Sequence, residues 1–198
     1  MSVKLSAQYL DQLKALHRKS FGRGSRIPEQ VKKIINEDNI KTFLDFGCGK
    51  GLTSNTIRET YPNLNLYSYD PVTSPIDLPK KVNMIYSSDV LEHVEPEHLD
   101  DTLNILFKTA TQYQYHLIAC HRAKKKLPDG RNAHLIIEKP DWWKKKLEEK
   151  MNKFGWKFIH ESVTEHYYEK FDINAVKYIS VIKKVNPKQE EPMGVAGL

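Results

Sequence analysis

The feature that most constrains this chain is a short apolar run that ends in closely spaced glycines. Residues 42–46, Thr-Phe-Leu-Asp-Phe, are followed by Gly47-Cys48-Gly49-Lys50-Gly51 and then by a segment of helical character at 52–60. Glycine adopts backbone angles closed to other residues and lets a ligand approach the chain without a Cβ in the way. The helix behind such a loop directs free amides and its positive dipole end at that ligand. The pattern therefore predicts a strand–loop–helix unit that binds a ligand with a small anionic part.

The alternation of strands and helices continues along the chain. Further patterns predict strands at 64–69, 82–87, 115–119, 157–163 and 175–182, with helices at 96–109 and 140–154. Strands that alternate with helices form a mostly parallel sheet covered on both faces, and the last two strands are expected to pair antiparallel at its edge. In such α/β sheets, ligands bind outside the carboxyl ends of the strands, near the point where the strand order reverses. The residues directly after each strand are therefore the candidate site residues.

The first 36 residues are expected to form a helical cover. Residues 5–20 carry leucine and tyrosine side chains at helical spacing, residues 21–25 break the pattern as a flexible joint would, and a second helix follows. Whether this part closes over a ligand as a lid or only covers one face of the sheet is left open. Residues 37–185 then form the main domain, and residues 186–198 have the composition of a flexible tail.

The composition excludes some classes of protein. No stretch of the 198 residues approaches the roughly 18–20 uncharged apolar residues of a membrane span. The two cysteines, Cys48 and Cys120, show neither metal-ligand nor disulfide spacing, so a cytoplasmic location is expected. The net charge of +6 comes with short basic clusters, such as 122–126 and 144–146. Basic patches alone provide only nonspecific affinity for phosphate, so they favour a solvated surface over a nucleic-acid interface.

An acidic residue at the end of the second predicted strand narrows the ligand. Asp70 stands where a carboxylate can accept both hydroxyls of a ribose. A dinucleotide-binding loop would need glycine at position 52, where the chain has Leu52. A phosphate-binding P-loop would need serine or threonine directly after Gly49-Lys50, where the chain has Gly51. The pattern therefore indicates a nucleoside other than a dinucleotide or nucleoside triphosphate.

Two segments resemble motifs of class I S-adenosylmethionine-dependent methyltransferases. The run from Asp45 to Gly51 is similar to the acid-x-Gly-x-Gly-x-Gly motif of this family, and 82–94, VNMIYSSDVLEHV, is similar to its fourth strand and the segment behind it. The resemblance covers roughly 40–182 and is to the small bacterial and phage members. It implies a Rossmann-like, doubly wound sheet of seven strands, mostly parallel with an antiparallel last strand. Because few residues separate Asp70 from Met84, the third strand and its helix are expected to be trimmed.

The resemblance also implies S-adenosyl-L-methionine as the cofactor and a methyltransferase activity. Asp45 and the glycine loop would contact the methionine part, Asp70 the ribose, Asp77 the adenine, and Ser88 would lie under the sulfonium. The full implied set of cofactor-binding residues is Asp45, Gly47, Cys48, Gly49, Asp70, Pro71, Asp77, Ser88 and Asp89.

The candidate catalytic residues follow the next strands. His93 and His134 are candidate bases, which a hydroxyl acceptor would need at neutral pH. The sequence around them resembles ubiquinone-pathway O-methyltransferases and small-RNA 2′-O-methyltransferases, in which an acid-x-x-Glu-His motif and a later histidine hold a divalent metal ion near the acceptor. The implied metal ligands are Asp89, Glu92, His93 and His134. Two alternatives stay open: a histidine base without metal, and histidines that only pack or bond the backbone.

The acceptor is predicted to be a small molecule or a carbohydrate, methylated on oxygen. The loop 121–132, with Tyr9, His17 and Phe21, is expected to form the wall of the acceptor pocket. One alternative is an RNA 2′-O-methyltransferase, and another is a cofactor-binding protein without transferase activity. Cys120 ends a predicted strand but lacks the motif of a nucleophile, so it is interpreted as a small packing residue. The oligomeric state stays open.

Overall fold

The computed structural model describes residues 3–19, 26–169 and 173–185. The predicted joint at 21–25, Phe21 and the predicted tail at 186–198 lie outside the described residues. The helices are α1 Ala7–Lys19, α2 Glu29–Glu37, α3 Leu52–Thr60, α4 Leu99–Thr109 and α5 Pro140–Phe154, with short 3₁₀ turns η1 Leu91–His93 and η2 Pro96–His98. The strands are β1 Thr42–Phe46, β2 Asn65–Tyr69, β3 Val82–Ser88, β4 Ala110–Ala119, β5 Trp156–Tyr168 and β6 Ile173–Lys184.

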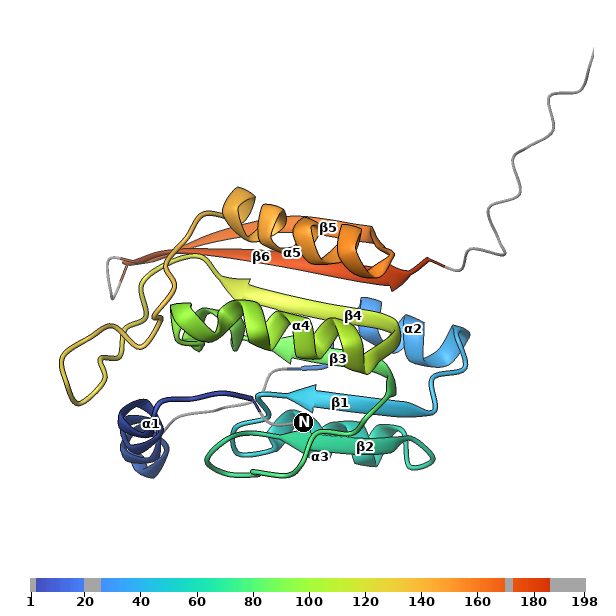
Figure 1. The fold of residues 1–198 in the computed structure, drawn as a ribbon, viewed down its shortest axis with the longest axis horizontal. Coiled ribbons are helices and arrows are strands. Elements are labelled where there is room, and N and C mark those ends of the chain that lie inside the picture. Colours follow the sequence, from blue (N-terminus) through green and yellow to red (C-terminus); the bar gives the residue numbers. More distant parts are fainter. Residues whose placement is uncertain (1–2, 20–25, 170–172, 186–198) are drawn as a thin grey trace, which may run out of the picture.

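The strands form one mixed sheet in the order β2-β1-β3-β4-β6-β5 (Figure 1). Strands β1 to β4 pair in parallel, whereas β6 is antiparallel to both of its neighbours. The predicted α/β fold with an antiparallel last strand is therefore confirmed. The sheet has six strands in the described part of the chain rather than seven, because the segment between β2 and β3 contains no strand or helix beyond an isolated bridge from Asp70 to Ser74. The chain winds from β1 to β2 on one side and returns to β3 on the other, which places the reversal of strand order at β1.

Helices cover both faces of this sheet. Helices α2 and α3 pack on one face, where Val31 and Ile57 contact a buried cluster with Phe43 and Met84. Helices α4 and α5 pack on the other face, where Leu103 of α4 belongs to a buried cluster with Leu44 of β1 and Ile85 of β3. Strands buried on both faces read as continuous apolar runs, which is why the sequence showed β1 and β3 clearly.

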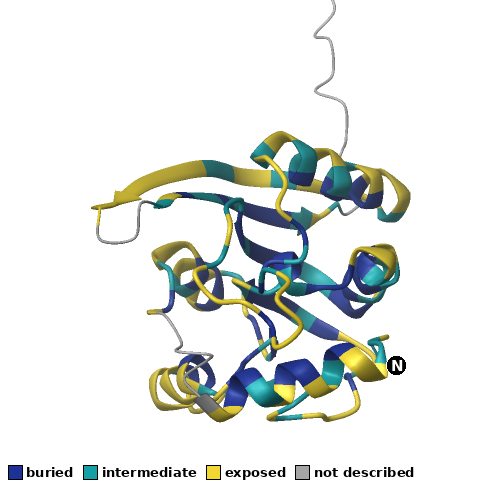
Figure 2. Cartoon of the chain, turned by 90° about the vertical axis from the view of Figure 1, so that its left-hand side faces the viewer, coloured by how far each residue is buried: buried dark blue, intermediate teal, exposed yellow. Residues whose placement is uncertain are grey.

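Three strands have boundaries that differ from the sequence prediction. Strand β4 begins at Ala110, before the predicted start at 115. The prediction missed its first half because polar side chains there, such as Gln114, hide the apolar pattern although they are buried. Strands β5 and β6 both extend beyond their predicted ends. The outer half of β5 pairs only with β6 and is exposed, as Figure 2 shows along the top edge. A strand with exposed sides needs no apolar pattern, so its length was not visible in the sequence.

The N-terminal part is divided between two places. Helix α1 lies beside the carboxyl ends of the parallel strands, together with the loop after β4 (Figure 1, left). Helix α2 instead belongs to the layer on one sheet face. None of the helices in the described ranges has the length and apolar character needed to cross a bilayer.

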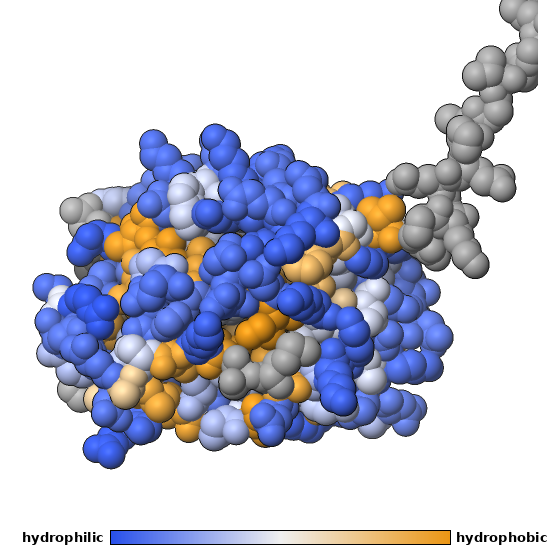
Figure 3. All heavy atoms as spheres, viewed as in Figure 1, coloured by the Kyte–Doolittle hydropathy of each residue, from blue (hydrophilic) through white to orange (hydrophobic). Residues whose placement is uncertain are grey.

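The lysine-rich part of α5 is a solvated face. Lys144 pairs with Glu161 at 2.9 Å, and Lys146 pairs with Glu149 at 3.3 Å. Figure 3 shows hydrophilic side chains over this helix. Acidic neighbours therefore offset much of the charge in this cluster.

Candidate functional site

The glycine loop begins where β1 ends and is fixed to the end of β2. The amides of Gly47 and Cys48 both donate to the carbonyl oxygen of Tyr69, at 2.7 and 2.9 Å. Gly47 has φ +79°, and a Cβ at this position would lie 2.4 and 2.6 Å from the two Cγ atoms of Val90. Glycine is therefore required here for both its backbone angle and the close approach of the segment after β3.

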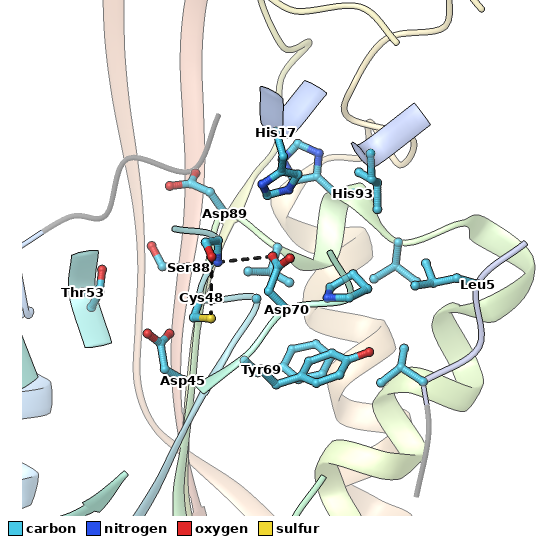
Figure 4. Close-up of a pocket in the computed structure, with 18 of the residues that line it drawn as sticks. Leu5, His17, Asp45, Cys48, Thr53, Tyr69, Asp70, Ser88, Asp89 and His93 are labelled. Atoms are coloured by element: carbon cyan, nitrogen blue, oxygen red, sulfur yellow. Dashed lines mark hydrogen bonds between the residues drawn. The ribbon is translucent and has the colours of Figure 1, made fainter. Parts of the chain in front are cut away.

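Asp70 connects the two halves of this loop region. Its buried carboxylate accepts the amide of Gly49 at 3.2 Å through Oδ2, and the amides of Val72 and Thr73 at 2.9 Å each through Oδ1. The dashed line that reaches Asp70 in Figure 4 marks its bond to the amide of Gly49. Backbone donors thus hold the carboxylate at the carboxyl ends of β1 and β2.

These residues border a pocket of about 240 Å³ at the carboxyl edge of the sheet. Of the predicted cofactor residues, all but Asp77 line it: Asp45, Gly47, Cys48, Gly49, Asp70, Pro71, Ser88 and Asp89. Asp77 is exposed and is not among the lining residues. The sequence did not identify several other lining residues: Val3, Leu5, Leu13, Thr53, Tyr69, Tyr86, Val90 and Val94. The tyrosines could have been inferred from their positions at strand ends, but the residues before α1 carry no such signal.

Asp45 lies at the floor of the pocket and belongs to a chain of hydrogen bonds. Ser54 donates its hydroxyl to Asp45 at 2.5 Å, Ser68 donates to Ser54 at 2.8 Å, and Arg58 donates to Ser68 at 3.0 Å. Burial raises the pKa of Asp45 from 3.8 to about 6, against the opposing effect of the Ser54 hydrogen bond. A buried carboxylate of this kind gains from a cationic ligand such as an ammonium group.

Helix α1 and the segment before it cover the pocket. Tyr9 and His17, both predicted for the acceptor wall, line it together with Leu13. The Tyr9 hydroxyl donates to the carbonyl of His93 at 2.5 Å. Ser6, at the start of α1, donates its amide at 2.8 Å and its hydroxyl at 2.5 Å to the buried carboxylate of Glu95. These bonds attach the cover to the segment after β3.

His93 and His134 lie together at the end of the pocket that faces β3 and β4. His93 lines the pocket, and His134 packs edge-on against it with ring centroids 4.8 Å apart. Nδ1 of His93 lies 2.7 Å from the carbonyl of Ala133, and Nδ1 of His134 lies 2.5 Å from the carbonyl of His121. A carbonyl only accepts, so each Nδ1 carries the proton and each Nε2 carries the lone pair. Burial lowers the pKa of His93 to about 4 and also lowers that of His134, so both rings are neutral at pH 7.

Glu92 is the third member of this cluster. Its side chain is fully buried, Oε1 accepts the amide of Ala119 at 3.0 Å, and Oε2 has no hydrogen-bond partner. Burial raises the pKa of this carboxyl to about 8. One ligand atom each from Glu92, His93 and His134 lie within 4.8 Å of one another. The donor types and the partnerless oxygen fit a bound divalent ion.

Asp89, the fourth implied ligand, is differently engaged. It lines the pocket and has φ +54°, but its carboxylate lies 3.1 and 3.4 Å from Nζ of Lys177 on β6. The sequence did not single out Lys177, because it stands in the alternating pattern of an ordinary strand. The structure therefore brings three of the four implied metal ligands together and places Asp89 with a lysine.

The loop 121–132 supports the site without lining the pocket. Leu127 and the neighbouring Ala133 pack on the apolar side of α1. Asn132 fixes the loop by accepting the amides of Ala123 at 2.9 Å and His134 at 3.0 Å. Phe21, the remaining residue predicted for the acceptor wall, is outside the described ranges.

The two cysteines are poor nucleophiles in this structure. Burial raises the pKa of Cys48 to about 12 and that of Cys120 to about 11. A thiol is reactive as the thiolate, which is scarce at such pKa values. This agrees with the interpretation of Cys120 as a packing residue.

Comparison with protein-family models and with curated proteins gives no match. Solved structures do match. An S-adenosylmethionine-dependent methyltransferase from Methanosarcina mazei has a TM-score of 0.55 at 11% identity, covering 81% of this chain and 99% of its own. The 1,6-didemethyltoxoflavin-N1-methyltransferase of Burkholderia thailandensis, with S-adenosylhomocysteine bound, has a TM-score of 0.55 at 11% identity, covering 94% of each chain. TehB from Haemophilus influenzae has a TM-score of 0.51 at 15% identity, covering 80% and 63%. The chain therefore has the fold of class I S-adenosylmethionine-dependent methyltransferases.

Proposed function

We propose that this chain is an S-adenosylmethionine-dependent methyltransferase that methylates a hydroxyl group. The observation that carries the proposal is the buried Asp70 carboxylate, held against the glycine loop at the point where strand order reverses. This is where a nucleoside binds in sheets of this type. The proposal draws further support from the fold of the matched methyltransferases.

The residues present suit each part of the cofactor. Glycine-loop amides and the N-terminal end of α3 offer donors and a positive dipole end to the methionine carboxylate. Asp45 would accept from the amino group, and Asp70 from the ribose hydroxyls. When bound, the cofactor supplies a methyl group on a sulfonium, a good leaving group for in-line displacement. The protein then has to align the acceptor oxygen with that methyl group.

His93 is the proposed base. Its Nδ1 proton is held by the Ala133 carbonyl, which leaves the lone pair on Nε2, and the neutral ring lines the pocket. With the cofactor bound, the lone pair on Nε2 of His93 would accept the hydroxyl proton while the acceptor oxygen displaces the sulfur from the methyl carbon. S-adenosylhomocysteine and the methylated acceptor are the products. His134 packs against His93 and is the second candidate for this role.

A small molecule or carbohydrate is the proposed acceptor. Helix α1 places Tyr9, Leu13 and His17 over the pocket, and the segment before it adds Val3 and Leu5. A site covered in this way suits an acceptor that can be enclosed.

RNA is the second candidate acceptor, on the basis of one observation. The segment 121–134 carries five cationic residues and one anionic residue, so it accounts for a net charge of 5 − 1 = +4 of the total of +6. All five cationic side chains are exposed beside the α1 cover: Arg122, Lys124, Lys125, Lys126 and Arg131. A 2′-O-methyltransferase would bind RNA with an affinity that falls steeply with salt concentration, and salt-independent or absent binding would exclude it.

Calorimetric titration with S-adenosylmethionine and S-adenosylhomocysteine tests the cofactor. We expect micromolar binding in the wild type and a loss of about 100-fold in Asp70→Asn, since two hydrogen bonds to a charged group are weakened. Asp77→Asn is the matched control and should bind like the wild type, because Asp77 is exposed outside the pocket. Absence of binding by folded wild-type protein would overturn the proposal. Binding without formation of S-adenosylhomocysteine across a panel of acceptors would instead support a binding protein without transferase activity.

A further inference from the structure

The outer half of β5 is an edge strand that extends beyond the body of the sheet. In the described part of the chain, β5 pairs with β6 alone, and β6 pairs with β4 only over residues 177–183. The two strands therefore project past the end of β4 as a ribbon (Figure 1). Residues 163–168 of this ribbon are all exposed. A two-stranded ribbon in water is only marginally stable by itself, so a further strand beside β5 would stabilise it.

Apolar side chains gather on this edge strand. Four of the seven large hydrophobic side chains that are exposed among the described residues lie on β5: Ile159, Val163, Tyr167 and Tyr168. Edge strands are usually protected against association by lysine, proline or a bulge. The bulge of β5 falls at Ile159, between Phe158 and His160. The regular stretch from 160 to 168, here called the outer run, contains neither lysine nor proline and is suited to pair with another strand.

The charges of the outer run favour a second copy of the same run as its partner. Antiparallel pairing of two copies places a two-fold axis through one residue, because side chains must stay on their own face of the sheet. An axis at Val163 would place Glu161 opposite Glu165, and an axis at Glu165 would place that residue opposite itself. Like charges directly opposite each other are destabilising. An axis at Thr164 avoids both arrangements, and it is the position that pairs the complete outer run.

We propose that two copies of this chain form a dimer in which their outer runs pair antiparallel about Thr164, so that the two six-stranded sheets become continuous. In this register Glu161 lies opposite Tyr167 of the second copy, and Val163 lies opposite Glu165 of the second copy. The contact is the same on both copies, so it closes after two and covers the exposed edge of each. The inference is independent of the proposed function, because it involves neither the pocket nor the acceptor.

Sedimentation equilibrium and hydrogen exchange of the wild-type full chain test this pairing. A contact of this length is at the small end of specific interfaces, so we expect a dissociation constant of about 10 μM. Amides of the outer run that point away from β6 should exchange about 4-fold more slowly at about 100 μM protein than at about 1 μM. Amides of β2, at the opposite edge of the sheet, should exchange equally at both concentrations. Wild-type protein that is monomeric at about 100 μM would overturn the proposal, and so would a dimer without this protection.

Two substitutions test the register. Val163→Glu places a carboxylate opposite Glu165 at both symmetry-related positions and should weaken the dimer by about 10-fold. Adding Glu165→Lys makes these pairs opposite in charge and should restore the affinity to within about 3-fold of the wild type. Ile76→Glu is the matched control, because it adds the same charge at an exposed apolar position after β2, at the other edge of the sheet. It should leave the dimer unchanged.

The outcomes of these variants separate the pairing from its register. Positions 163 and 165 are exposed, so the variants should fold, and circular dichroism checks that they do. A Val163→Glu protein that dimerises like the wild type would overturn the pairing through the outer run. Failure of Glu165→Lys to restore the dimer would overturn the axis at Thr164, and an Ile76→Glu loss as large as that of Val163→Glu would show that added charge alone is the cause.

Discussion

The proposed cofactor half of the pocket and the proposed acceptor half are built in different ways. The cofactor half comes from two short stretches, the glycine loop after β1 and the turn after β2, and its key bonds are made by backbone amides. The acceptor half combines side chains from η1, the loop after β4, β6 and α1. One half is a local motif, whereas the other exists only after the sheet has assembled.

This difference predicts how each half responds to substitution. A site formed by backbone hydrogen bonds is lost as a whole when the chain cannot adopt the required backbone angle or pack closely enough against its neighbour. A site formed by side chains loses one contact at a time, because each residue joins it through its own hydrogen bond or ion pair. Substitutions should therefore have large effects on the cofactor half and graded effects on the acceptor half.

Gly47→Ala should have the largest effect. The new Cβ would meet both Cγ atoms of Val90 at 2.4 and 2.6 Å and would also carry the strain of φ +79°. Overpacking and left-handed strain together should lower the free energy of unfolding by about 4 kcal/mol. Urea unfolding measures this, and cofactor binding should be lost with it.

Two further variants divide that effect into its causes. Gly130→Ala has φ +88° and open space around its Cβ, so it should cost only about 1 kcal/mol from backbone strain. Adding Val90→Ala to Gly47→Ala removes the clashing Cγ atoms and should recover about half of the lost stability. If Gly130→Ala were as damaging as Gly47→Ala, the close approach of Val90 would not be the cause.

Asp45→Asn should stabilise the cofactor-free protein while it weakens cofactor binding. The folded pKa of about 6 lies above the ordinary 3.8, so the stability contributed by Asp45 is complete below about pH 4 and is lost as pH rises through 6. The free energy of unfolding of the variant should therefore exceed that of the wild type by an amount that grows with pH, to about 3 kcal/mol near pH 7. Unfolding experiments at pH 5 and 7 measure this trend.

Cofactor titration of the Asp45→Asn variant tests the second expectation, that cofactor binding is weakened. The asparagine still accepts from Ser54 but lacks the charge for an ammonium group, so affinity for S-adenosylhomocysteine should fall. In the wild type, affinity should also fall as the pH drops below about 6, where Asp45 becomes protonated. A variant that binds as well as the wild type would remove Asp45 from the cofactor site.

The same contrast explains what could be predicted from the sequence. The glycine loop, Asp70 and the parallel sheet were predictable because each depends on neighbouring residues or on an apolar pattern. The roles of Lys177 and Glu95 were not, since their partners Asp89 and Ser6 lie 88 and 89 positions away. Their sequence surroundings are those of ordinary surface charges, and only the assembled sheet and α1 bring the partners together.

Tyr9→Phe tests the connection between α1 and the acceptor half. The substitution keeps the ring but removes the hydroxyl that donates to the carbonyl of His93. Loss of this hydrogen bond should weaken the attachment of α1 by about 1 kcal/mol and so speed the release of S-adenosylhomocysteine by about 5-fold. Tyr67→Phe, whose hydroxyl accepts from Asn65 outside the pocket, is the matched control. Equal release rates in the two variants would show that α1 does not retain the cofactor through Tyr9.

Lys177→Met should have the smallest effect on stability and still change the acceptor half. The ion pair with Asp89 is partly exposed, so its loss should cost less than about 1 kcal/mol. Burial is the main cause of the lowered pKa of His134, and the positive charge of Lys177 lowers it a little further, so removal of that charge should raise the pKa slightly. NMR titration of the imidazole resonances measures the change, with Lys145→Met on the exposed side of α5 as the control. A pKa of His134 that is the same in both variants would mean that Lys177 holds Asp89 without influencing the histidine pair, and the acceptor half would then divide into two independent parts.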